Sequence, residues 1–197
     1  MQKKVAITGG IGSGKSLAAA YVAKMGYPVF SCDEINKTLL LDADYVKKIA
    51  QLFPGCVLDG KIDKSSLKNK VFSNPAELEK LNKIAHKTIM ERLFSAMKQS
   101  KSELVFAEVP LLFEGNYEKS FDEIIVITRN IEDRIAAVQK RDGLSKQEVL
   151  GRIAVQFDYN KLQERIKNMS VYLIDNEGDE WSLQNKIQVS LDKIKKS

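Results

Sequence analysis

The chain has 197 residues and a formal net charge of +5, and 44% of its residues are hydrophobic and 29% charged. This composition is typical of a folded globular protein and excludes a disordered chain, which combines low apolar content with high net charge. No stretch approaches the ~20 consecutive apolar residues that a membrane-spanning helix needs. Two Cys and one His exclude a four-ligand structural zinc site and a disulfide framework.

Residues 1–5 lack the apolar region of a secretory signal peptide. Together with the low cysteine count, this predicts a reduced, cytoplasmic protein that does not contact a membrane. The basic residues are interspersed with acids, whereas nucleic-acid binding needs a clustered basic face, so we expect no nucleic-acid partner. The sequence leaves the oligomeric state open between a monomer and a weak homo-oligomer.

Short apolar runs alternate with helical segments along the chain. The runs predict five buried strands, at Lys4–Thr8, Pro28–Phe30, Leu104–Val109, Glu123–Thr128 and Val171–Asp175. Helices are predicted at Leu17–Met25, from Pro75 onward, from the Asn130 cap to about Arg141, after the Ser145 capping box, and at Glu180–Ile194. Strands that alternate with helices indicate a parallel α/β sheet.

The stretch 34–100 interrupts this alternation, because it is mostly helical and has almost no core-type strand. Its one exception is Val57–Ile62, where Asp59-Gly60 is typical of a tight hairpin turn. We therefore predict a helical insertion after the second strand.

The motif that carries chemistry is Gly9–Ser16, which matches G-x-x-x-x-G-K-[ST] in full. It lies between a predicted strand and a predicted helix, which is the context that a phosphate-binding loop requires. Glycines let successive backbone N–H groups point at phosphate oxygens, and the helix adds its positive end. Lys15 is expected to reach the β- and γ-phosphates, and the Ser16 hydroxyl to ligate Mg²⁺. The sequence therefore predicts binding of a nucleoside triphosphate.

Several classes of protein use such a loop. A GTPase would carry Asn-Lys-x-Asp, and none of the Asn-Lys pairs is followed by that Asp. Motor and ABC-type ATPases need more chain, so a small kinase with a P-loop remains. A non-enzymatic nucleotide switch is the competing hypothesis; it predicts ATP binding without turnover stimulated by an acceptor.

A kinase of this kind needs a base near the acceptor hydroxyl and arginines that close over the phosphates. Asp33, at the carboxyl end of the second strand, is the candidate base. The alternative is that Asp33 caps the helix that follows it. The candidate arginines bracket the helices after the fourth strand, and we expect only one or two of them to touch phosphate: Arg129, Arg134, Arg141 and Arg152.

Over nearly its whole length the chain resembles the dephospho-CoA kinase family. Thr8–Ser16 is similar to the family's opening, and 26–33 to its second strand and acidic base. Pro110–Glu114 is similar to its Pro-Leu-Leu-Phe-Glu motif, the most discriminating element. Arg141-Asp142 resembles its lid arginine motif, and 174–178 its C-terminal turn.

The resemblance implies ATP-dependent phosphorylation of the ribose 3′-hydroxyl of dephospho-coenzyme A. The expected architecture is a P-loop NTPase-type five-stranded sheet with a helical acceptor-side insertion and a helical lid. Three groups of residues divide the chain: a nucleotide-binding core at 1–33, 101–130 and 168–197, an acceptor insertion at 34–100, and a lid at 131–167. Another small-molecule P-loop kinase, acting on a nucleoside or nucleotide, is the alternative.

The resemblance favours Asp33 as the base, with Lys15 and Arg141 as its catalytic partners. The expected nucleotide-binding residues are Gly10, Ile11, Gly12, Ser13, Gly14, Lys15, Ser16, Leu17 and Asn176. Ser16 and, through a water molecule, Glu108 are the expected Mg²⁺ site. On the substrate side, His86 lies in the insertion, Leu112 belongs to the Pro-Leu-Leu-Phe-Glu motif, and Phe113 could stack on an acceptor base or pack in the core.

Some positions depart from the family pattern. Leu17 replaces the usual Thr, where only the backbone N–H is needed, and Ser31 stands where a first Asp is frequent. Glu108 stands where Asp is usual; its longer carboxylate could still hold a Mg²⁺-bound water. The segment from Gln156 to Asn176 is longer than the family's by about one helical turn, so no role is assigned to Gln156.

Overall fold

In the computed structural model, which describes residues 2–167 and 169–197, the chain divides into two compact units. The first joins Met1–Phe30 to Met97–Ser197, and the second is Ser31–Ala96. The predicted segment boundaries at residues 1 and 168 lie outside the described residues. The finer division into core, insertion and lid stays a prediction.

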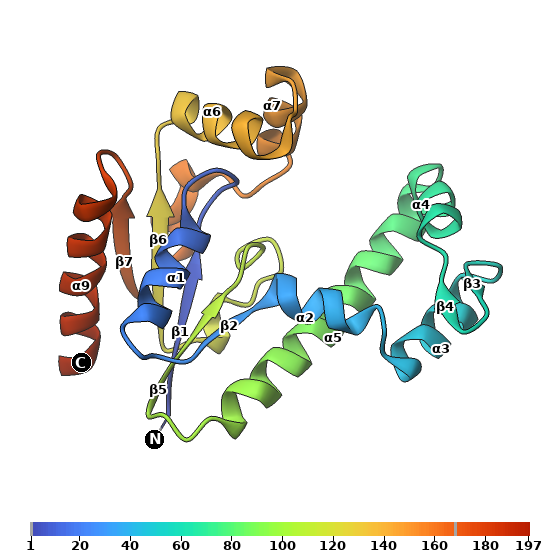
Figure 1. Ribbon diagram of the computed structural model, residues 1–197, viewed down its shortest axis with the longest axis horizontal. Helices are drawn as coiled ribbons and strands as arrows, with labels where there is room; N and C mark the ends of the chain where they lie inside the picture. The colour runs from blue at the N-terminus through green and yellow to red at the C-terminus, as the bar shows by residue number, and fades with distance from the viewer. Residues whose placement is uncertain (1, 168) are drawn as a thin grey trace. The chain divides into compact units, whose positions relative to one another are not determined.

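The first unit is built on a five-stranded sheet in the order β2-β5-β1-β6-β7 (Figure 1). Its strands are β1 (Lys3–Thr8), β2 (Val29–Ser31), β5 (Leu104–Glu108), β6 (Glu123–Thr128) and β7 (Ser170–Asp175). The β1 strand pairs in parallel with β5 and β6, and β6 pairs in parallel with β7. These strands confirm all five predicted ones, and no strand end differs by more than one residue.

Helices cover this sheet because its strands are apolar on both sides. The helices of the first unit are α1 (Lys15–Lys24), α6 (Ile131–Asp142), α7 (Lys146–Ala154), α8 (Leu162–Arg165) and α9 (Glu180–Lys196). One core joins α1 and α9 to the sheet, with Val22, Ile7 and Ile187 fully buried in it. Figure 1 shows α9 alongside β7. The α1 helix begins at Lys15, two residues before the predicted start, so the end of the glycine motif forms its first turn.

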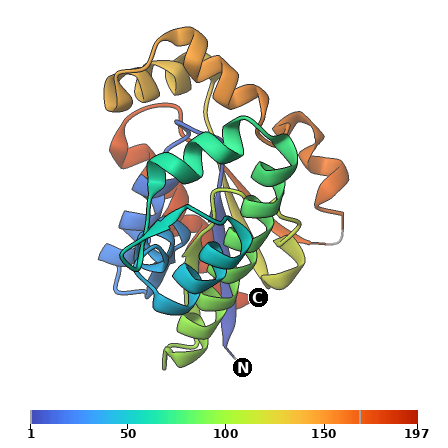
Figure 2. The same ribbon diagram turned by 90° about the vertical axis from the view of Figure 1, so that its right-hand side faces the viewer.

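The α6 and α7 helices lie beyond the carboxyl end of β6 in both views (Figures 1 and 2). The Asn130 side chain caps α6 by accepting a hydrogen bond from the backbone N–H of Asp133, and Gly143 ends the helix with φ 69°. Ser145 and Glu148 form the predicted capping box of α7. A small apolar cluster, centred on Ile135, holds the two helices together.

The second unit is mostly helical, as predicted (Figure 2). It contains α2 (Cys32–Leu39), α3 (Ala43–Leu52), β3 (Val57–Leu58), β4 (Lys61–Ile62), α4 (Lys64–Phe72) and most of α5 (Pro75–Gln99). The two strands form the predicted hairpin, with φ 48° at Asp59 and 74° at Gly60. Its own core is built around Leu39, Ile49 and Phe53. Within the described residues no helix has the length and apolarity to cross a membrane.

Candidate active site

The loop from Gly9 to Gly14 joins the carboxyl end of β1 to α1, and its glycines are required by its surroundings. Gly12 and Gly14 have φ values of 77° and 97°, which strain any residue with a side chain. A Cβ atom on Gly12 would also lie 2.5 Å from the carbonyl oxygen of Arg134, and one on Gly14 would collide with the Asn176 amide. The loop can therefore pass close under α6 and the β7–α9 turn only with glycine at these positions.

The first turn of α1 presents a positive end. Its N-cap is Gly14, which has no side chain to satisfy the first amides, and the turn contains no acidic residue. The N–H groups of Lys15, Ser16 and Leu17 therefore have no acceptor within the helix. Such an end, next to a lysine, attracts an anion such as phosphate.

A cavity of about 170 Å³ opens beside this turn. It is lined by Gly12, Gly14, Lys15, Ser16, Leu17, Arg129, Ala137, Val138, Arg141 and Asn176. The structure thus brings together most of the predicted nucleotide-binding residues with the predicted lid arginine. The Asn176 side chain also donates a hydrogen bond of 2.8 Å to the carbonyl oxygen of Ser13, which ties the turn after β7 to the loop.

Ser16 and Glu108 lie in direct contact at the ends of α1 and β5. The Ser16 hydroxyl donates a hydrogen bond of 2.6 Å to Glu108 Oε1, and Glu108 is buried. Among residues 2–167 and 169–197, no group of three or more His, Cys, Asp or Glu side chains is arranged to hold a metal ion. A hydroxyl and a carboxylate are nevertheless the oxygen ligands that Mg²⁺ takes when substrate phosphates supply the rest.

The opposite side of the loop is held by two side chains. Gln156, just after α7, accepts a hydrogen bond of 2.8 Å from the backbone N–H of Ile11. Arg134, on α6, donates one of 2.9 Å from Nε to the carbonyl oxygen of Ile11. Both polar groups of one loop residue are therefore occupied. No local sequence pattern indicates this role for Gln156, because its partner lies 145 residues away.

Arg141 is held differently. It donates two hydrogen bonds to the neighbouring Asp142, of 2.7 Å from Nε and 2.9 Å from Nη2. Arg152 lies 3.6 Å from the same carboxylate. Hydrogen bonds from Arg141 hold the pKa of Asp142 below its usual value, so this carboxylate stays charged at neutral pH.

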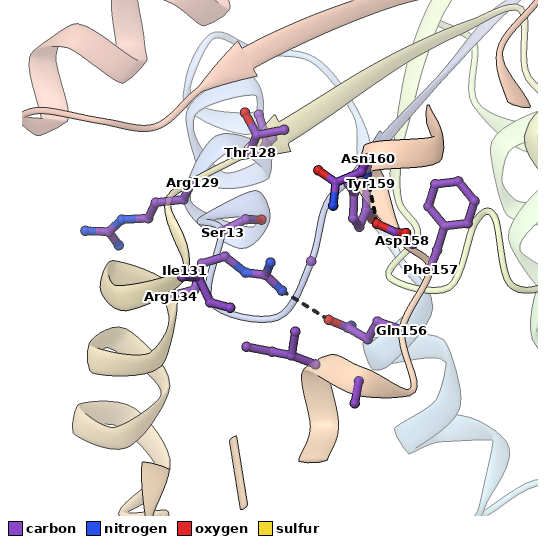
Figure 3. A pocket seen from close by; sticks show the side chains of 14 residues that line it. Ser13, Thr128, Arg129, Ile131, Arg134, Gln156, Phe157, Asp158, Tyr159 and Asn160 are labelled. Carbon is purple, nitrogen blue, oxygen red and sulfur yellow. Dashed lines mark hydrogen bonds between the residues drawn. The ribbon is translucent and has the colours of Figure 1, made fainter. Parts of the chain in front are cut away.

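A second cavity, of about 600 Å³, lies between the loop, the carboxyl end of β6 and the segment after α7 (Figure 3). Its walls carry Arg129, Arg134 and Gln156, with Ser13 at the loop and Tyr159 on the other side. Burial raises the pKa of Tyr159 to about 12, so its hydroxyl stays protonated. This cavity offers two guanidinium groups and a large space next to the phosphate loop.

The Pro-Leu-Leu-Phe-Glu segment after β5 packs inward. Leu112 and Phe113 are both buried, and the Phe113 ring lies 4.7 Å from that of Phe157. This burial favours the packing alternative for Phe113 over base stacking. Glu114 accepts a hydrogen bond of 2.8 Å from the backbone N–H of Phe157, which fixes the segment after α7 to the β5 loop.

Asp33 and His86 belong to the second unit, so their predicted contacts with substrate stay predictions. The capping alternative for Asp33 is wrong, because α2 begins at Cys32, two residues earlier than expected, and is capped by Ser31, whose side chain accepts a hydrogen bond from the N–H of Glu34. Asp33 is left as an exposed carboxylate in the first turn. His86 is half-buried on α5.

A family model described as dephospho-CoA kinase matches residues 3–181. The dephospho-CoA kinase of Thermus thermophilus is 31% identical over 187 residues, which cover 95% of this chain and 89% of that protein. The crystal structure of TT1252 from Thermus thermophilus aligns with a TM-score of 0.81 at 31% identity, over 98% of this chain and 97% of that one. The dephospho-CoA kinase from Campylobacter jejuni, at 24% identity, aligns with a TM-score of 0.67 over 100% of this chain and 98% of its own, which supports the fold.

Proposed function

The chain belongs to the dephospho-CoA kinase family, and we propose that its phosphate loop, Asp33 and the arginines of α6 carry out the reaction. That reaction transfers a phosphoryl group from ATP to the ribose 3′-hydroxyl of dephospho-CoA and yields coenzyme A. The acceptor is an alcohol, so the enzyme needs a clamp for the triphosphate, a base for the hydroxyl proton and positive charge for the transferred group.

The clamp is the loop from Gly9 to Ser16. The cavity beside the first turn of α1 supports this role, since amide groups, Lys15 and the helix end converge there. Ser16 and Glu108 would hold Mg²⁺, Ser16 directly and Glu108 through water; when bound, the ion neutralises charge on the phosphates. Their hydrogen bond supports the pairing, because it keeps both oxygens at one point beside Lys15.

Asp33 is the base. It follows the carboxyl end of β2 by two residues, and carboxyl ends of strands border the crevice in open α/β sheets. Because Ser31 caps α2, capping does not account for a carboxylate at position 33. His86 would contribute to acceptor binding from the insertion.

The helices α6 and α7 act as the lid. Arg134 and Arg141 line the two cavities at the loop, and guanidinium groups suit the charge that spreads over three phosphoryl oxygens. Arg141 would move from Asp142 to the phosphates on closure.

The observation that carries the proposal is the convergence of Lys15, Ser16 and Arg141 on one cavity at the loop. The test measures ADP release with dephospho-CoA, with a panel of nucleosides and nucleotides, and without acceptor. We expect release only with dephospho-CoA. Faster turnover with a nucleoside would favour the alternative kinase, and ATP binding without stimulated release would favour a switch.

The base is tested by Asp33→Asn, which keeps the side chain's size. We expect the affinity for ATP and the melting temperature to be unchanged and kcat to fall roughly a hundredfold or more. Glu34→Gln, an exposed neighbour in the same turn, is the matched control and should keep the wild-type rate. A wild-type rate for Asp33→Asn would remove Asp33 from the mechanism.

A further inference from the structure

Three hydrogen bonds form a ring of Ile11, in the loop, and two side chains that lie far from it in the sequence, and two of these bonds are made by Ile11 itself. Gln156 Oε1 accepts from the Ile11 N–H, and Arg134 Nε donates to the Ile11 carbonyl. The ring is closed by Arg134 Nη2, which donates to the same Gln156 oxygen at 3.5 Å (Figure 3). One amide oxygen therefore holds both a loop N–H and a guanidinium.

We propose that Gln156 is a positioning residue for phosphoryl transfer, which aims Arg134 at the phosphates and fixes Ile11 of the loop. This inference rests on the proposed role of that loop. Gln156 acts through Arg134 rather than by touching the reacting atoms.

The backbone around Gln156 is suited to this role because it is anchored on both sides. The Gln156 N–H donates to the carbonyl of Ile153, at the end of α7. The next residue, Phe157, donates its N–H to Glu114 and packs its ring on Phe113. The preceding residue, Val155, is 81% exposed, whereas Gln156 is half-buried against the loop.

The Arg134 guanidinium lies over the loop at Gly10, which has no side chain. A Cβ atom on Gly10 would collide with the Arg134 guanidinium, so this group rests on the Gly10 backbone. A long arginine side chain has many rotamers, and holding it in one conformation before the reaction avoids an entropic cost during it. The carbonyl of Ile11 fixes Nε, and Gln156 fixes the outer nitrogen.

The neutral charge of glutamine matters here. An amide oxygen orients the guanidinium but leaves its full charge for the phosphates. A carboxylate at the same position would also accept from the Ile11 N–H, yet it would pair with Arg134 and cancel that charge. Gln156→Met and Gln156→Glu thus remove different parts of the arrangement.

The experiment compares Gln156→Met, Gln156→Glu and the control Gln163→Met, which makes the same chemical change at an exposed position of α8. Steady-state kinetics with ATP and dephospho-CoA are combined with thermal melting. For Gln156→Met we expect kcat to fall about tenfold to a hundredfold, with the KM for dephospho-CoA within about twofold. Gln156→Glu should melt like the wild type and still lose kcat. Gln163→Met should match the wild type throughout.

A double-mutant cycle separates positioning from a purely structural contribution. In an Arg134→Met background, Gln156→Met should lower kcat by no more than about threefold further, because Arg134 is already absent and only the contact with Ile11 is left to lose. An equal loss in both backgrounds, a loss confined to the melting temperature, or a wild-type rate for Gln156→Glu would overturn the inference. Should Gln156→Met fail to fold, Gln156→Glu carries the same cycle. The Lys15→Ala variant tests the role of the loop separately. If Lys15→Ala is inactive and Gln156→Met is fully active, the positioning role of Gln156 is rejected and the proposed function of the loop is kept.

Discussion

Two arginines on the same helix, Arg134 and Arg141, are held in opposite ways. Arg134 is half-buried, and its partners are a backbone carbonyl of the loop and a neutral amide. The Arg141 side chain is 60% exposed, and its partner is the carboxylate of the next residue. Both lie seven residues apart on one face of α6.

This contrast separates a preorganised group from one that must move. Arg134 is half-buried and already bonded to the loop backbone, so we expect it to be in place before the nucleotide binds. An exposed ion pair contributes little to stability and exchanges readily, so Arg141 can leave Asp142 when phosphates compete for it. We therefore expect loss of Arg134 to cost more than loss of Arg141.

Lys15→Ala is expected to lower the rate more than loss of either arginine, because Lys15 lies in the phosphate loop itself. We expect kcat/KM for ATP to fall on the order of a thousandfold, with an unchanged far-UV circular dichroism spectrum. Steady-state kinetics measure the effect. Lys24→Ala, at the far end of α1, is the control, and a near-normal rate for folded Lys15→Ala would place the active site elsewhere.

Arg134→Lys tests the preorganised side. Lysine keeps the charge but cannot bond the Ile11 carbonyl and Gln156 with a fixed fork. We expect kcat to fall roughly a hundredfold, whereas the KM for dephospho-CoA stays within about twofold. If the Arg134→Lys variant keeps the wild-type rate, charge alone is needed at this position and the hydrogen-bonded ring is dispensable.

The contacts around the loop also differ in how well the sequence predicts them. The loop, its strand and its helix follow from a local pattern of glycines, Lys and Ser, and the five strands follow from short apolar runs. Arg141-Asp142 is likewise a contact between neighbours. Gln156 could not be found this way, because its contact with Ile11 depends on how α6 and α7 fold back over the loop.

The N-cap of α2, beside Asp33, is a second feature that the sequence predicts incorrectly. The sequence predicts Asp33 as the alternative cap for this helix, but in the structure the cap is Ser31, which is an equally good N-cap residue type. Ser31 takes the role because β2 ends there, so the helix begins at Cys32 and leaves Asp33 in its first turn. The choice depends on the end of a three-residue strand, which the apolar run places one residue too early, at Phe30 instead of Ser31.

Arg141→Ala tests the mobile side. We expect kcat and kcat/KM for ATP to fall together by about tenfold, because the contact forms chiefly in the transition state. Arg141→Lys should recover only part of this loss, since an ammonium lacks the bidentate fork. The same assay supplies the measurement, and wild-type rates for both variants would make Arg141 a surface charge and leave α6 and α7 without a lid function.

The smallest effect is expected from Asp142→Asn, which weakens the hold on Arg141 without removing the arginine. Removing this carboxylate makes the net charge beside the loop more positive by one, which favours binding of the anionic nucleotide. We therefore expect the KM for ATP to fall about twofold to threefold, with kcat unchanged and a weaker effect at high salt. The pKa of Asp142 is lowered, so protonation cannot mimic the variant near neutral pH.

The control for net charge is Asp192→Asn, which removes one negative charge at an exposed position of α9 outside both cavities. This variant should leave the KM for ATP unchanged. A rise in KM, or a tenfold loss of kcat, would give Asp142 the opposite role. It would then orient Arg141 for the reaction, as Gln156 is proposed to orient Arg134, and both arginines would be preorganised. Because the two roles change KM in opposite directions, the sign of a small effect is enough to decide whether Arg141 waits beside the site or is already in place.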